Sequence, residues 1–273
     1  MGQFTDSIDL ETIETWFAHF GTTDIGYLRD NFDRFVSTRS FALHELPQQD
    51  ALTVLDVGAH WLHQAFLYAN DGHRLVCVDS PNTFKYSSVV AAAEKMGAQL
   101  EAAIRLDKGE GFSNIADDSI DLLLFCEILE HLAFNPIPMW KEIYRVLRPG
   151  ARLVVTTPNA YFGGKLETRL EAIFSGEGFG VPVEDIFKIG TFGHHWKEYS
   201  STEILKYFEI LSPDFIPGRL ELHATRKWGP YPQHELSAPI RSAVNTEADT
   251  IYFELVLLRK DTGIVPKVPW EIA

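Results

Sequence analysis

The feature that most constrains the fold is an alternation of apolar runs and helical patterns between residues 51 and 156. The apolar runs lie at residues 51–57, 74–78, 100–106, 120–126 and 151–156. Helical spacing of apolar residues lies between several of them, at residues 62–70, 89–96 and 138–147. Strands that alternate with helices predict parallel pairing, with helices on both faces of the sheet. The strands are apolar almost throughout, which fits burial on both sides.

The rest of the chain extends this α/β pattern. Two later apolar runs, 219–227 and 250–259, add two strands, so we predict a doubly wound, mostly parallel, seven-stranded sheet. A tight turn is expected at Arg148-Pro149-Gly150. Helical patterns near residues 8–20 and 25–44 predict an N-terminal helical cap over residues 1–48. The main domain would then cover 49–273, with a lid-like insertion rich in Gly, Phe and His after the fifth strand, at about 160–200.

The charge and the cysteines limit the partners and the compartment. A formal net charge of −14 without a basic cluster repels phosphate backbones, so we predict no nucleic-acid partner. No apolar run approaches the length of a membrane span, and residues 1–10 do not resemble a secretory signal. Cys77 and Cys126 lie in strand-like runs, which indicates reduced, buried thiols and a cytoplasmic location.

Acidic residues end the first two predicted strands. Ligands of such sheets bind at the carboxyl ends of the strands. Gly58 follows the first of these acids, Asp56, and permits a tight turn with close backbone approach. Asp79 follows about twenty residues later, where an acid can accept hydrogen bonds from ribose hydroxyls. Both acids could instead cap loops or helices, but their spacing favours a nucleoside ligand.

Four segments carry a family resemblance. VLDVGAH, VCVDS, DDSIDLLLFCEILEHL and EIYRVLRPGARLVVTTPN, in that order, resemble the successive motifs of class I S-adenosylmethionine (SAM) dependent methyltransferases. The likeness covers about residues 50–160, is weaker at 193–204, and is greatest to small-molecule enzymes of the ubiquinone/menaquinone-biosynthesis type. It implies a Rossmann-like fold, SAM as the cofactor and methyl transfer.

The resemblance also implies cofactor-binding roles for individual residues. The SAM-binding loop would contain Asp56 and Gly58, the ribose would meet Asp79 with Ser80 beside it, and Asp107 would lie near the adenine. The methionine part would meet Cys126 and Glu127 after the fourth strand. The remaining matches to the family are Glu130 and His131, its Glu-His pair.

The loop departs from the family pattern at two positions. His60 and Leu62 replace the second and third glycines of Gly-x-Gly-x-Gly. Either the loop shifts slightly and SAM still binds, or binding is weakened or lost. The side chain of His60 could hydrogen-bond the methionine carboxylate, or it could be a solvent-exposed loop histidine.

Three histidines are candidates for a general base toward a hydroxyl acceptor. His131 follows the fourth strand, whereas His194 and His195 lie in the insertion with Glu198, which could orient one of them. These residues could equally order a loop or pack the insertion on the sheet. We predict no metal site. Aromatic residues of the insertion could line an acceptor pocket or form its own core: Phe162, Phe174, Phe179, Phe187, Phe192 and Trp196.

The predicted function is transfer of a methyl group to an O or N atom of a small-molecule acceptor. The N-terminal helices could cover SAM from the other side, with Tyr27, Arg29 and Arg34 as candidate contacts. The alternative is a partner subunit that keeps the fold but has lost SAM.

Two other classes of enzyme fit the sequence less well. A nicotinamide-dependent oxidoreductase would be expected to have a more complete glycine-rich motif. An adenine methylase of nucleic acid usually has an Asn/Asp-Pro-Pro-aromatic loop after the fourth strand, where this chain has Cys126-Glu127-Ile128-Leu129. The sequence leaves the acceptor and the oligomeric state open.

Overall fold

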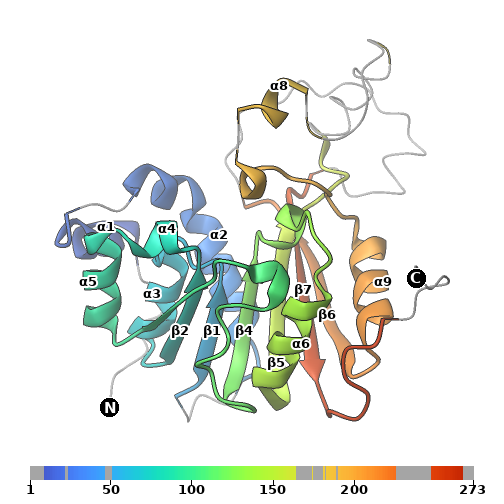
Figure 1. The fold of residues 1–273 in the computed structure, drawn as a ribbon. Coiled ribbons are helices and arrows are strands. Elements are labelled where there is room, and N and C mark those ends of the chain that lie inside the picture. The colour runs from blue at the N-terminus through green and yellow to red at the C-terminus, as the bar shows by residue number, and fades with distance from the viewer. Residues whose placement is uncertain are drawn as a thin grey trace.

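The protein is built around one seven-stranded sheet, whose strands lie next to one another across the computed structural model in Figure 1. The model describes residues 9–21, 24–46, 51–163, 174, 181, 183–188, 190–225 and 247–266. The strand order is β3-β2-β1-β4-β5-β7-β6. The strands are β1 (Thr53–Val57), β2 (Arg74–Asp79), β3 (Gln99–Ala102), β4 (Ile120–Cys126), β5 (Leu147–Pro158), β6 (Phe215–His223) and β7 (Thr250–Leu257).

The first five strands are parallel, and the last two form an antiparallel edge. β1 pairs with β2 and β4, while β7 pairs with both β5 and β6. The strand order reverses between β1 and β4, which is where an open α/β sheet leaves a crevice for a ligand. The predicted doubly wound, Rossmann-like fold is confirmed. The carboxyl ends of the parallel strands point toward the top of Figure 1.

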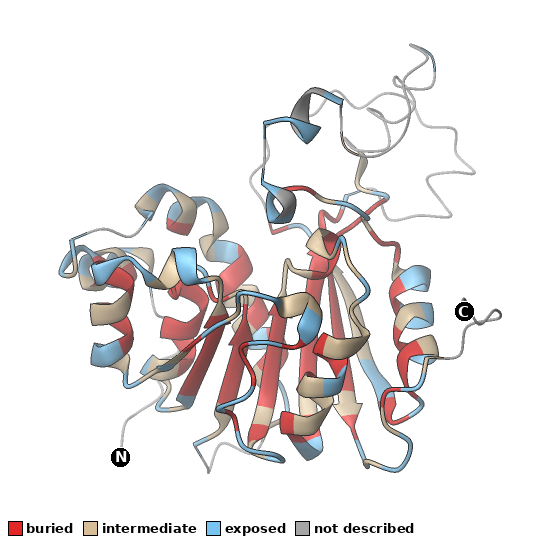
Figure 2. Ribbon diagram, viewed as in Figure 1, coloured by how far each residue is buried: buried red, intermediate tan, exposed pale blue. Residues whose placement is uncertain are grey.

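Helices cover both faces of the sheet. They are α1 (Leu10–Ala18), α2 (Ile25–Leu43), α3 (His63–Asn70), α4 (Pro81–Phe84), α5 (Ser87–Met96), α6 (Ile137–Val146), α8 (Val183–Ile186) and α9 (Ser201–Leu211). One apolar core joins α1, α2, α3 and α5 to one face, and the other joins α6 and α9 to the opposite face. The strands lie between the two cores, as the buried band of Figure 2 shows.

The N-terminal helices belong to the first of these cores. Phe17 and Leu28 are fully buried, and Phe17 packs against Phe66 of α3 with ring centroids 5.6 Å apart. Asp9 and Asp24 cap α1 and α2 through hydrogen bonds to backbone N–H groups three residues on. The predicted boundary at 48/49 lies outside the described residues, so the division into a cap and a main domain stays a prediction.

Two parts of the fold differ from the sequence prediction. Arg148-Pro149-Gly150 is not a separate turn, because β5 begins at Leu147, which pairs with Ile120 before the register shifts. β6 begins at Phe215, four residues earlier than predicted, and ends at His223. β4 advances from Ile120 to Leu122 while β5 advances from Leu147 to Arg152, and this irregularity in the ladder accommodates the Pro-Gly step inside β5.

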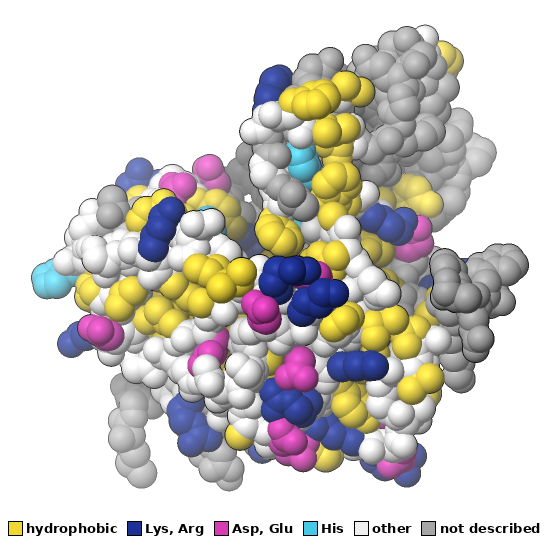
Figure 3. All heavy atoms as spheres, in the orientation of Figure 1, with side chains coloured by type: hydrophobic (Ala, Val, Ile, Leu, Met, Phe, Trp, Pro, Cys, Tyr) yellow, Lys and Arg dark blue, Asp and Glu magenta, His cyan; other side chains and the backbone are white. Residues whose placement is uncertain are grey.

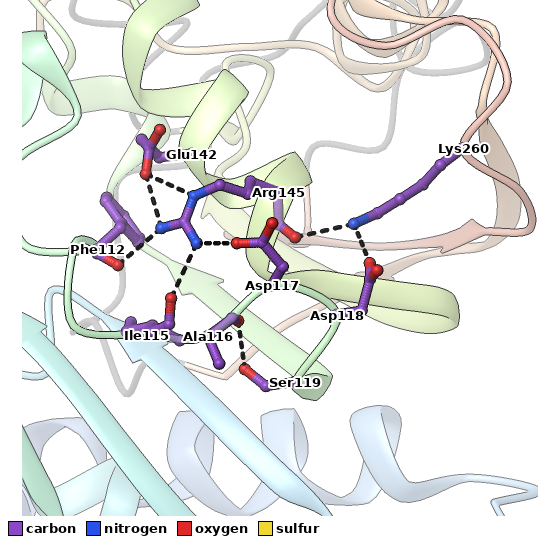
Figure 4. A network of polar contacts seen from close by, with 9 residues as sticks. All are labelled: Phe112, Ile115, Ala116, Asp117, Asp118, Ser119, Glu142, Arg145 and Lys260. Carbon is purple, nitrogen blue, oxygen red and sulfur yellow. Dashed lines mark hydrogen bonds and ion pairs between the residues drawn. The ribbon is translucent and has the colours of Figure 1, made fainter.

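A network of polar contacts closes the edge of the sheet where β4 begins. The guanidinium of Arg145 on α6 donates to the carbonyls of Phe112 and Ile115, at 2.9 Å each, and pairs with Asp117 (Figure 4). Lys260 joins this network through Asp118 and the carbonyl of Arg145. This edge lies opposite the carboxyl ends of the strands, so we assign the network to structure. Within the described ranges, no helix is long and apolar enough to cross a membrane.

Candidate active site

The loop after β1 keeps a left-handed backbone at three alternate positions. The φ angles are 77° at Gly58, 47° at His60 and 67° at Leu62. Non-glycine residues rarely adopt this region, and it costs roughly 1–2 kcal/mol at each. These are the positions where the resembled loop carries its glycines. The two residues that replace glycines therefore hold backbone conformations that glycine adopts readily.

Hydrogen bonds and packing hold this loop in place. The N–H of Gly58 donates to the carbonyl of Val78 at 2.8 Å, and the N–H of His60 donates to Oδ2 of Asp79 at 2.7 Å. A Cβ on Gly58 would lie 2.1 Å from Cδ1 of Ile128, so a larger residue here would have to displace that side chain. Leu62 is fully buried in the core, which anchors the end of the loop.

Two carboxylates end β1 and β2, as predicted. Asp56 is buried, and its Oδ2 has no hydrogen-bond partner in the part of the chain that the structure describes. Burial, followed by the charge of Asp79, raises the pKa of Asp56 to about 7. Asp79 accepts hydrogen bonds from the N–H of Ser80 and the hydroxyl of Thr83 as well as from the loop. Asp56 is thus a buried carboxylate that a cationic or hydrogen-bonding ligand would satisfy.

Arg34 on α2 places a buried cation beside these strand ends. It is 3% exposed, and its guanidinium donates to Oδ1 of Asn31 at 3.1 Å and to the hydroxyl of Tyr27 at 3.3 Å. Burial opposes its charge, but nearby groups, Glu127 foremost, raise the pKa of Arg34 above its usual value. The side chain therefore stays charged beside the strand ends.

Two cavities meet at Arg34 and Tyr27. The smaller, about 30 Å³, lies at the loop, and the larger, about 590 Å³, lies toward the insertion. The larger volume is within the range of small-molecule sites. The smaller is lined by Tyr27, Arg34, Phe35, Asp56, Gly58, Ala59, His60, Trp61, His63, Gln64 and Cys126. The larger is lined by Tyr27, Arg29, Asp30, Asn31, Asp33, Arg34, Glu127, Glu130, His131, His195 and Thr225.

Most of the predicted site residues gather at these cavities. Asp79 and Ser80 adjoin the smaller cavity through the loop contact described above, while Glu198 lies 3.1 Å from the ring of His195. The ring of His194 is buried and packs against Trp196, so it lines neither cavity.

Asp107 lies apart from the gathered residues. It pairs with Arg105 at 2.8 Å in the segment after β3 and lines neither cavity. Its contact with adenine stays a prediction.

Sequence reasoning missed two polar residues on α3. His63 and Gln64 line the smaller cavity, and both nitrogens of the His63 ring lack a hydrogen-bond partner. Burial lowers the pKa of His63 to about 3, so the ring is neutral. The position of His63 directly after the loop that follows β1 was the sequence feature from which its place at the site could have been predicted. Both cysteines carry free thiols, Cys77 buried and Cys126 half-buried.

The aromatic insertion is only partly described. Phe174, Phe187, Phe192 and Trp196 are exposed, and Figure 3 shows apolar side chains gathered on the part of the surface that holds α8 and the neighbouring segment. Phe179 lies outside the described residues. A core formed by the insertion, or a pocket wall, stays a prediction.

Comparison with known proteins agrees with this geometry. Residues 55–155, from β1 to β5, match a sequence family described as a methyltransferase domain. No curated protein matches the chain. The sheet and flanking helices give the chain the Rossmann-like fold of class I methyltransferases, and the family match supports SAM as the cofactor.

Solved structures with the same fold share little sequence with the chain. A chain from a Haloferax volcanii complex that contains the Trm112 methyltransferase activator is 17% identical, with a TM-score of 0.55. The alignment covers 93% of this chain and 100% of that one. A SAM-dependent methyltransferase from Mesorhizobium loti is 15% identical, with a TM-score of 0.53, over 82% of this chain and 97% of that one. These likenesses establish the fold.

Proposed function

We propose that this chain is a SAM-dependent methyltransferase that acts on an O or N atom of a small-molecule acceptor. The observation that supports it best is the loop after β1, which keeps the left-handed backbone at Gly58, His60 and Leu62. Backbone strain of this kind clusters at ligand-binding sites, so the strain at His60 favours a loop that still binds SAM over a partner subunit that has lost it.

The residues present fit the cofactor. The carboxylate of Asp79 lies at the end of β2 for the ribose hydroxyls. The buried, unpartnered oxygen of Asp56 and the cation of Arg34 would meet the amino and carboxylate groups of the methionine part. When bound, SAM supplies an electrophilic methyl group on a sulfonium sulfur.

The larger cavity would hold the acceptor. Glu127, Glu130, His131 and His195 line it from the end of β4 and from the insertion. An amine acceptor needs mainly positioning, whereas a hydroxyl must lose a proton, which the imidazoles of this cavity suit. Burial and the neighbouring His195 lower the pKa of His131, so its ring is neutral and can accept a proton at pH 7. The cavity therefore favours a hydroxyl acceptor.

The narrower likeness to ubiquinone/menaquinone enzymes and the cytoplasmic location remain predictions from the sequence. The net charge of −14 continues to argue against a nucleic-acid acceptor. One structural neighbour belongs to a complex with a methyltransferase activator.

A transfer assay tests the proposal. The protein is incubated with methyl-labelled SAM and a panel of small phenols, alcohols and amines, and labelled product and S-adenosylhomocysteine are quantified together. We expect both to form in equal amounts with at least one acceptor class, hydroxyl compounds foremost. Glu127→Gln should slow transfer, while Asp261→Asn, at a distant exposed position, should not. Protein that binds SAM but methylates no acceptor would favour the non-catalytic alternative.

A further inference from the structure

Three side chains at the acceptor end of the larger cavity converge on one point. Glu130, His131 and His195 each offer a ligand atom, and these atoms lie within 4.8 Å of one another. Glu130 and His131 come from the turn after β4, and His195 comes from the insertion more than sixty positions later. All three line the larger cavity.

Glu130 has one carboxylate oxygen that none of the described residues satisfies. Its side chain is 0% exposed, and Oε2 accepts a hydrogen bond from the hydroxyl of Thr157 at 2.9 Å. Among the described residues Oε1 has no hydrogen-bond partner, and it lies 3.9 Å from Nε2 of His131. A buried carboxylate in this state gains strongly from a cation.

Both imidazoles are fixed by acceptors on their far side. Nδ1 of His131 lies 2.9 Å from the carbonyl oxygen of His194, and Nδ1 of His195 lies 3.1 Å from Oε1 of Glu198. A carbonyl can only accept, so Nδ1 of His131 carries the proton and its Nε2 keeps a lone pair. The carboxylate of Glu198 favours the same tautomer in His195. Histidines that bind metals are held in this way by carbonyl or carboxylate groups.

The backbone ties the two segments together. The N–H of Trp196 donates to the carbonyl of Glu130 at 2.7 Å, and the rings of His131 and His195 meet edge to face with centroids 4.7 Å apart. The two backbone segments that carry the three ligands are therefore held against each other. Metal–ligand distances are about 2.1 Å, so the cluster would tighten by small side-chain rotations. The side chain of His195, 36% exposed, has room for them.

We propose that Glu130, His131 and His195 bind a divalent transition-metal ion of the Zn²⁺ or Mn²⁺ class. Two imidazoles and one carboxylate form a ligand set typical of such ions in catalytic sites, where a further position stays open. Here that position would face the larger cavity. This role rests on the proposed methyl transfer: an ion there would bind an acceptor oxygen and lower its pKa. Nε2 of His131 would then be a metal ligand and not the proton acceptor, so the hydroxyl proton would leave to solvent. This proposal departs from the prediction, made from the sequence, that there is no metal site.

Calorimetric titration of the metal-free protein, prepared without a polyhistidine tag, with Zn²⁺ and separately with Mn²⁺ tests this site. We expect one ion of at least one metal to bind per chain. Glu130→Gln and His195→Gln should weaken binding by at least about tenfold. The matched control, His44→Gln, changes an exposed histidine at the end of α2 and should bind like the wild type.

A second measurement separates this proposal from the proposed function. S-adenosylhomocysteine binding should be the same in His195→Gln as in the wild type, and far-UV circular dichroism should show both folded. The metal site is wrong if the folded wild type binds neither ion. It is also wrong if Glu130→Gln and His195→Gln bind as tightly as the control. Metal binding without any cofactor binding would leave the site in place but remove its proposed role.

Discussion

Leu62→Gly is expected to lower the free energy of unfolding by about 3 kcal/mol, while His60→Gly changes it by less than about 1 kcal/mol. Both replacements restore a glycine at a position with positive φ and relieve strain. Leu62, however, is fully buried, and its removal leaves a cavity in the core beside α3. His60 is exposed, and its side chain makes only edge-on ring contacts, with Tyr27 and Trp61 among the described residues.

Urea unfolding followed by circular dichroism measures both changes. His60→Gly should also retain its affinity for S-adenosylhomocysteine, because the group that bonds Asp79 is the backbone N–H of residue 60. Loss of affinity in this variant would instead assign a binding role to the imidazole. An equal loss of stability in both variants would contradict the account of the loop.

Arg34→Met is expected to weaken S-adenosylhomocysteine binding by about 10- to 100-fold, the cost of a lost hydrogen bond to a charged group. It should also lower the free energy of unfolding by about 2–4 kcal/mol, because Asp56 and Glu127 would lose the buried cation beside them. Methionine fills much of the volume of the arginine stem, so packing is largely kept.

Arg259→Met provides the matched control for that variant. Its side chain is 74% exposed and pairs with Asp261 at the surface, where such pairs contribute little. Calorimetry gives the affinities, and urea unfolding gives the stabilities. If Arg34→Met bound the cofactor product as tightly as Arg259→Met, the proposed contact between Arg34 and the methionine part would be wrong.

The sequence predicted the parallel part of the fold well because its strands are buried on both faces. Apolar runs ending in Asp56 and Asp79 fixed the positions of β1 and β2, and so the edge where the site lies. The antiparallel placement of β7 between β5 and β6 could not be predicted, because pairing between distant strands leaves no local pattern. The Pro149-Gly150 step suggested a turn, but the ladder with β4 extends beyond it through a register shift.

Candidate site residues were easiest to name where they follow the strands. Gly58 and Asp79 became candidates because strand ends converge at one edge of a parallel sheet. The burial of Arg34 on α2 depends on how an N-terminal helix packs, which spacing alone does not reveal. The meeting of Glu130 and His131 with His195 depends on the path of the insertion. The positive φ angles at His60 and Leu62, which glycine adopts readily, could not be predicted from the two side chains.

The most direct test is calorimetric titration of the wild type, Asp79→Asn and Asp261→Asn with S-adenosylhomocysteine. We expect the wild type and Asp261→Asn to bind one molecule per chain with equal affinity. Asp79→Asn should bind at least about tenfold more weakly, because the carboxylate for the ribose hydroxyls is lost. No binding by folded wild type would contradict the central claim, and equal binding by all three proteins would contradict the placement of the cofactor at the end of β2.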